Sequence, residues 1–153
     1  MGSLGTLLAC VGEWRGVNRL YETADGPADE SDSQVRVSLV LGGRFVRIDQ
    51  RWAREGVAQE GSLLIGHDPQ ANVATGHWVD TFHMGRNVMA CTGDVRDDGT
   101  VDLRGGYAAP PGPDWGWRIT VGRDEEGGLE IAMYNVDPDG NEALAVRATH
   151  VRA

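Results

Sequence analysis

The chain contains no lysine: its 14 basic side chains are all arginines, set against 23 aspartates and glutamates. Without lysine, mechanisms that need a side-chain Schiff base or a phosphate-binding lysine are excluded, and with them pyridoxal chemistry and Walker-type nucleotide binding. The formal net charge of -9 repels phosphate backbones and anionic lipid headgroups, so we expect no nucleic acid and no membrane as partners. The arginine-only basic set is typical of a high-GC bacterial genome.

Cysteine and long apolar runs are also scarce. Cys10 and Cys91 are the only two cysteines, too few for a disulfide framework and without a Cys-x-x-Cys spacing, so we expect reduced, packed thiols. No apolar run approaches the ~20 residues that span a bilayer. The start "MGSLGTLLACVGEW" lacks the basic region of a signal peptide, which favours a cytoplasmic location.

Histidines at metal-ligand spacings are missing as well. His77 and His83 lie six residues apart, on opposite faces of a continuing strand, and the sequence has no His-x-His or His-Glu-x-x-His pattern. We therefore expect no metal site.

Short strand-like runs make up most of what is present. A single domain is expected over residues 1–153, with helical turns at Leu4 to Val11. After these, apolar side chains alternate with polar ones, most clearly in "QVRVSLVL". The runs lie at 13–21, 34–41, 44–53, 57–67, 73–82, 87–96, 100–107, 114–124, 128–136 and 142–152.

The connections between these runs decide the expected topology. Most are too short for crossover helices, so neighbouring strands should pair as antiparallel hairpins. About ten such strands in one domain fit a sandwich or a closed up-and-down barrel. The sequence offers little edge protection by lysine or strand proline, which favours the closed barrel.

Two connections differ from ordinary turns. The acidic segment Glu22 to Ser33 lacks apolar anchors, and we expect it to be a mobile, solvated loop between the first two strands. The proline-rich segment Ala108 to Asp114 is expected to be a stiffer link, able to fold over one mouth of the barrel.

Several spaced motifs resemble known barrels. "VGEWRG" is similar to the Gly-x-Trp-x-Gly opening of lipocalin-like and nitrobindin-like proteins. Together with "LGGRFVRIDQRW", "GHDPQANVATGHWVDTF" and the ending "THVRA", it resembles a bacterial lipocalin-like family of unknown function. The resemblance implies a barrel closed at one end by Trp14. The chain departs from the family pattern at His67, Thr81 and His150.

Alternation also predicts which side chains face the interior. In 44–53 the inward set is Val46, Ile48, Gln50 and Trp52, because the opposite face carries three charges that are costly to bury. A barrel of about ten strands is wider than one that side chains just fill, so we expect an internal cavity, with Gln50 and Trp52 on its wall.

In 73–82 the aromatic residues Trp78 and Phe82 lie on the same face of the strand, which we therefore expect to face inward. Asp80 lies on that face as well. An inward carboxylate needs a partner, for which Arg152, His83 or a ligand donor are candidates. Alternatively, Asp80 holds the turn around His83 through backbone N–H groups. The sequence leaves both readings open.

We expect a small hydrophobic or amphipathic molecule to bind in the cavity. The predicted apolar wall consists of Trp52, Trp78, Trp117 and Met133. The polar side chains expected to orient the ligand are Asp80, Gln50 and His150. One alternative is a cofactor-free isomerase, cyclase or hydrolase that uses Asp80 with a histidine, His83 or His150, as acid and base. Another follows from the nitrobindin-like resemblance, which implies haem with His150 as proximal ligand. The ligand's identity stays open, and so does the oligomeric state, with a homodimer as one option.

Overall fold

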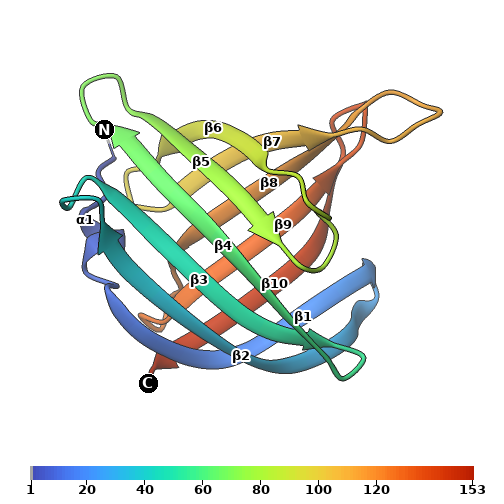
Figure 1. The fold of residues 1–153 in the computed structure, drawn as a ribbon, viewed down its shortest axis with the longest axis horizontal. Helices are drawn as coiled ribbons and strands as arrows, with labels where there is room; N and C mark the ends of the chain where they lie inside the picture. Colours follow the sequence, from blue (N-terminus) through green and yellow to red (C-terminus); the bar gives the residue numbers. More distant parts are fainter. Residues whose placement is uncertain (1) are drawn as a thin grey trace.

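Ten antiparallel strands close into a barrel in the computed structural model, which describes residues 2–153 (Figure 1). Each strand pairs with its neighbours in sequence, and β1 pairs with β10 to complete the ring. This confirms the predicted up-and-down barrel with a short helical start. The elements are α1 (Gly5–Leu8), β1 (Gly12–Thr23), β2 (Gly26–Val40), β3 (Phe45–Arg54), β4 (Val57–Asp68), β5 (Val73–Asp80), β6 (Met89–Val95), β7 (Val101–Tyr107), β8 (Trp115–Arg123), β9 (Leu129–Val136) and β10 (Glu142–Arg152).

Period-two alternation places one face of each strand in the core. In β3 the buried residues are Val46, Ile48, Gln50 and Trp52, as predicted. The opposite face carries Arg47, Asp49 and Arg51, whose side chains are 48%, 39% and 75% exposed. Charge burial therefore decided the orientation of this strand.

The helical end of the barrel is sealed around Trp14. Its indole N–H donates to the Cys10 carbonyl at 2.8 Å, and the Arg152 guanidinium lies 4.5 Å from the ring centroid. Leu7 of α1 is buried in the same core. Cys10 and Cys91 are both free thiols and both buried, as predicted.

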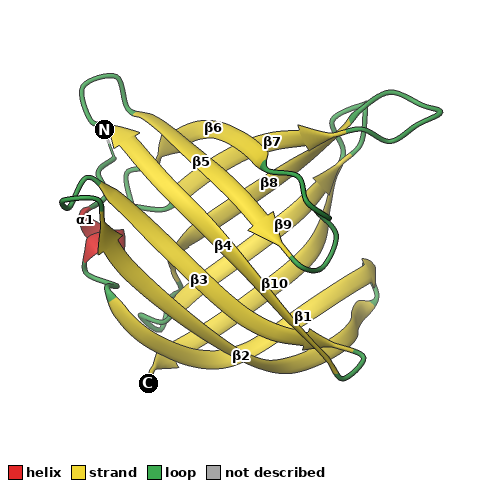
Figure 2. Cartoon of the chain, in the orientation of Figure 1, coloured by secondary structure: helices red, strands yellow, loops and turns green. Residues whose placement is uncertain are grey.

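The predicted loop at residues 22–33 is wrong. After a turn at residues 24–25 the chain re-enters the sheet at Gly26, and β2 pairs with β1 from there onward (Figure 2). Ser31 Oγ accepts the Ala53 N–H at 2.9 Å, and Asp29 Oδ2 accepts the Glu55 N–H at 3.1 Å. Acidic side chains here face solvent while the backbone forms a ladder, so their charge did not indicate a loop.

The proline-rich segment behaves differently from its prediction as well. Residues 108–114 join β7 to β8 and extend away from the barrel instead of folding over a mouth (Figure 1). Residues 110–114 are all exposed. None of the helices within residues 2–153 has the length and apolar character to cross a membrane.

Candidate functional site

A small cavity lies inside the barrel, toward the end opposite Trp14. Its free volume is about 10 Å³, room for roughly one water molecule. This cavity is much smaller than the one expected from the strand number, because large side chains such as Trp52, Trp78 and Met133 line it. The wall consists of Asn18, Leu20, Gln50, Trp52, Trp78, Asp80, Phe82, His83, Met133 and Val146.

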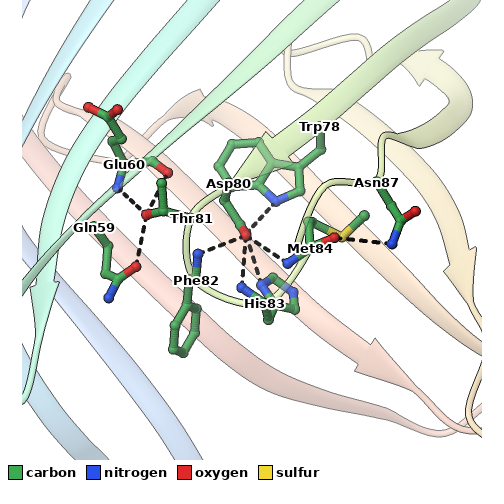
Figure 3. Close-up of polar contacts among 9 residues, drawn as sticks. All are labelled: Gln59, Glu60, Trp78, Asp80, Thr81, Phe82, His83, Met84 and Asn87. Carbon is green, nitrogen blue, oxygen red and sulfur yellow. Dashed lines mark hydrogen bonds and ion pairs between the residues drawn. The ribbon is translucent and has the colours of Figure 1, made fainter.

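Asp80 ends β5 and organises the turn that follows (Figure 3). Its Oδ1 accepts the backbone N–H groups of Phe82, His83 and Met84 at 3.0, 2.8 and 3.0 Å. Its Oδ2 accepts the Trp78 indole N–H at 2.9 Å and lies 2.8 Å from His83 Nδ1. β5 therefore stops short of the predicted run 73–82, and the carboxylate is fully used by its own turn and by Trp78.

The charge state of Asp80 follows from these bonds. Burial raises the pKa of the carboxyl, but hydrogen bonds from the His83 side chain and from the backbone N–H groups of His83 and Met84 outweigh it and lower the pKa to about 2. Asp80 is an anion at neutral pH, so it cannot serve as a general acid there.

His83 lies at the mouth of the cavity with its side chain 35% exposed. The ring packs between Phe82 and Trp117, with centroid distances of 5.3 and 5.0 Å. Since Asp80 accepts from Nδ1, the carboxylate orients the imidazole. His77, by contrast, is exposed on the outer face of β5, as the alternation predicted.

Three buried N–H groups around this end of the barrel lack an acceptor among residues 2–153. They are Nδ2 of Asn18 and the indole nitrogens of Trp52 and Trp117. Asn18 and Trp52 line the cavity, and Trp117 packs on His83, which also lines it. A buried donor without a partner costs about 1–3 kcal/mol, so an acceptor from outside the chain, either a water molecule or a ligand, would be stabilised in this region.

A chain of polar side chains lies deeper in the barrel. His150 Nδ1 lies 3.1 Å from the Leu129 carbonyl, and its Nε2 lies 2.8 Å from Ser33 Oγ. A carbonyl only accepts, so Nδ1 carries the proton and Nε2 accepts the Ser33 hydroxyl. Gln50 Nε2 donates to Asn18 Oδ1 at 3.0 Å and to Ser33 Oγ at 3.4 Å. Burial lowers the pKa of His150, and the bond to Leu129 opposes this effect only in part. The lowered pKa keeps the imidazole neutral.

Sequence reasoning missed Asn18 and Ser33. Asn18 follows Trp14 and Gly16 at period two in the first strand, so alternation alone could have placed it inside. Ser33 fell in the segment interpreted as a loop, where no face could be assigned.

The residues predicted for the site divide into three groups by position. Trp52, Trp78, Gln50, Met133, Asp80 and His83 line the cavity. Trp117 lies beside it, in contact with His83. His150 lies deeper and does not line it, so it is part of the polar core.

The barrel does not fit haem. Haem iron needs a histidine nitrogen with an available lone pair and a pocket for the macrocycle. His150 Nδ1 donates to Leu129 and Nε2 accepts from Ser33, and the free volume of about 10 Å³ is far too small. Within the described residues, no group of three or more His, Cys, Asp or Glu side chains is placed to hold a metal ion.

A larger hollow of about 710 Å³ lies on the outer side of β1 to β5. Its rim carries exposed charges of both signs, such as Arg36 and Glu13, which pair at 2.5 Å with side chains 64% and 62% exposed. Exposed pairs of this kind stay hydrated and contribute little free energy. The interior, where donors are buried and unpaired, is the stronger candidate.

The sequence profile described as "Protein of unknown function (DUF1579)" matches residues 5–152. The chain belongs to the DUF1579 family. The match confirms the family resemblance that the spaced motifs predicted. No curated protein shows significant sequence similarity to this DUF1579 chain.

Among solved structures, the DUF1579 barrel is similar to one described as "Crystal Structure of Rv2717c from M. tuberculosis". The TM-score is 0.57 at 13% sequence identity, over 97% of this chain and 98% of that chain. At this identity the likeness shows the fold alone.

Proposed function

We propose that this DUF1579 protein binds a small apolar molecule carrying a hydrogen-bond acceptor inside the barrel, at the end ringed by Trp52, Trp78 and Trp117. The observation that carries the proposal is the set of three buried N–H groups without acceptors in this region. Aromatic walls supply the apolar contact area, and the donors would fix the orientation of the ligand.

Binding requires space that the closed barrel lacks. Phe82 and His83 form the outer part of the wall, and Phe82 packs edge-on against Trp52 with centroids 6.4 Å apart. Both belong to the segment between β5 and β6, where the residues from Gly85 to Val88 are exposed. A ligand would enter when the Phe82 ring rotates outward, while Asp80 keeps the turn and the His83 ring in place.

Nile red, a neutral dye whose emission rises in apolar surroundings, tests this proposal. Val146→Phe fills the cavity wall, where Val146 is 8% exposed; Val151→Phe adds the same ring to the same strand at a 60% exposed position. We expect saturable binding by the wild type and by Val151→Phe, and loss of binding by Val146→Phe, with folding checked by circular dichroism.

Native mass spectrometry of the purified protein adds a second readout, since a co-purified ligand appears as a discrete mass increase that Val146→Phe should lose. Equal dye binding by Val146→Phe and the wild type would place the dye outside the barrel, and absence of binding by the wild type would contradict the proposal.

The Asp80–His83 pair supports a second candidate, a hydrolase or isomerase. The carboxylate holds Nδ1 of His83 at 2.8 Å, an arrangement that orients the imidazole as a general base. Asp80 would then be a positioning residue. Hydrolysis of p-nitrophenyl acetate should fall in His83→Gln and persist in His77→Gln, whose residue is exposed on the outer face. Equal rates in all three proteins would exclude this hydrolase.

A further inference from the structure

We infer that the barrel selects neutral ligands that accept hydrogen bonds, such as ketones, esters and lactones, over carboxylates. The inference rests on the proposed function and specifies its ligand class. It follows from which polar groups around the cavity are already paired and which are not.

In this region, the buried N–H groups without a partner among the described residues all belong to neutral side chains. Asn18 offers an amide N–H, while Trp52 and Trp117 offer indole N–H groups, and none of the three carries a charge or an available acceptor at that atom. Their complement is a lone pair on oxygen. A ketone or ester oxygen supplies this with little desolvation cost, since it carries no formal charge.

A carboxylate ligand meets an unfavourable field at the same wall. Asp80 is buried, with 8% of the residue exposed, and borders the cavity. The Arg54 guanidinium lies 5.1 Å from the Phe82 ring centroid, but Arg54 is exposed and does not line the cavity. Of the other ionisable wall groups, only His83 remains, and its Nδ1 is engaged by Asp80. An anion brought inside would therefore be repelled by Asp80 without a cation beside it.

Three small probes of matched shape separate these cases: acetophenone as the neutral acceptor, benzoate as the anion and ethylbenzene as the hydrocarbon. Binding is followed through the indole N–H signals in ¹H–¹⁵N spectra, assigned with single Trp→Phe variants. We expect acetophenone to shift the Trp52 or Trp117 indole signal and to bind at least about tenfold more tightly than benzoate. Ethylbenzene should perturb the ring signals without a downfield indole N–H shift.

Trp52→Phe and Trp117→Phe remove the donors while keeping aromatic rings, and Trp115→Phe is the matched control, because Trp115 is 37% exposed. Loss of one neutral hydrogen bond should weaken acetophenone binding by about two- to tenfold in one or both of the first two variants. The control should bind like the wild type.

The outcomes distinguish this inference from the function on which it rests. If benzoate binds as tightly as acetophenone, the selectivity is wrong while interior binding stands. If ethylbenzene matches acetophenone and neither Trp→Phe change matters, the donors have no role and the inference again fails. If none of the three probes perturbs an interior signal, the proposed function itself fails.

Discussion

The Ser33 hydroxyl and the His150 imidazole meet at 2.8 Å across a glycine. In the sheet register Gly16 lies between them, opposite His150 on β10 and opposite Ser33 on β2. A Cβ on Gly16 would lie 2.8 Å from His150 Cα and 1.8 Å from the Thr149 carbonyl oxygen. The second glycine of the Gly-x-Trp-x-Gly motif thus allows three strands to pack closely and two buried polar side chains to bond.

The first prediction concerns that bond. Ser33→Ala leaves the buried Nε2 of His150 without a partner, so the free energy of unfolding should fall by about 1–3 kcal/mol. In a double-mutant cycle with His150→Phe, urea denaturation should show a coupling energy of about 0.5–3 kcal/mol. Ser38→Ala, on the same strand with its side chain partly exposed, is the control. Additive losses would mean that the two side chains do not interact in solution.

The second prediction is a pH dependence carried by Asp80. Its pKa is lowered from 3.8 to about 2 in the folded state, so its contribution is fully present above pH 3.8 and is lost as the pH falls toward 2. The shift corresponds to about 2 kcal/mol. Asp80→Asn should therefore be less stable than the wild type at neutral pH and lose less stability between about pH 4 and 2.

Chemical denaturation at several pH values measures this difference. Asp139→Asn is the control: Asp139 is exposed in the turn between β9 and β10, so this variant should follow the wild-type curve across the same window. If the free energy of unfolding of the wild type and of Asp80→Asn fell equally between about pH 4 and 2, Asp80 would not be the group that causes the loss of stability in acid.

The third prediction tests the strand at the acidic segment. Because β2 begins at Gly26 and pairs with β1, amide hydrogens in residues 28–33 that join the ladder should exchange far more slowly than those of a free loop. The Ala53 amide, bonded to Ser31 Oγ at 2.9 Å, should exchange faster in Ser31→Ala. Rapid exchange of all amide hydrogens in residues 26–33 would show that this segment is a loop in solution.

The fourth prediction concerns haem. Both ring nitrogens of His150 are engaged by Leu129 and Ser33, so titration of the purified protein with haem should produce no Soret shift typical of histidine ligation. Ser33→Ala releases Nε2 and is the informative companion variant. A His150-dependent Soret band in the wild type would show that the barrel opens and rearranges more than this geometry allows.

Local patterning predicted the barrel well. The inward set of β3, with Gln50 and Trp52, follows from period two and the cost of burying charge. The inward face of β5, with Trp78 and Asp80, follows from period two and the aromatic pair Trp78 and Phe82. The prediction of a loop at residues 22–33 was wrong, because composition reports only how polar the side chains are. A strand is held by backbone hydrogen bonds to its neighbours, so it can form from a segment with few apolar side chains. The prediction of a large internal cavity was wrong, because the strand number sets the width of the barrel while the size of the inward side chains decides how much free volume remains.

By itself, the sequence determined the closed antiparallel barrel, through its short connections and unprotected edges, and the inward faces of its strands, through alternation along each strand. Tertiary structure decided how those residues are used. Asp80 holds the turn after β5, because the backbone N–H groups of Phe82, His83 and Met84 and the Trp78 indole converge on it. Equally, only the meeting of separate strands paired His150 with Ser33 and left Asn18, Trp52 and Trp117 without acceptors. Hydrogen-bond partners come from strands far apart in the chain, and no local pattern records them.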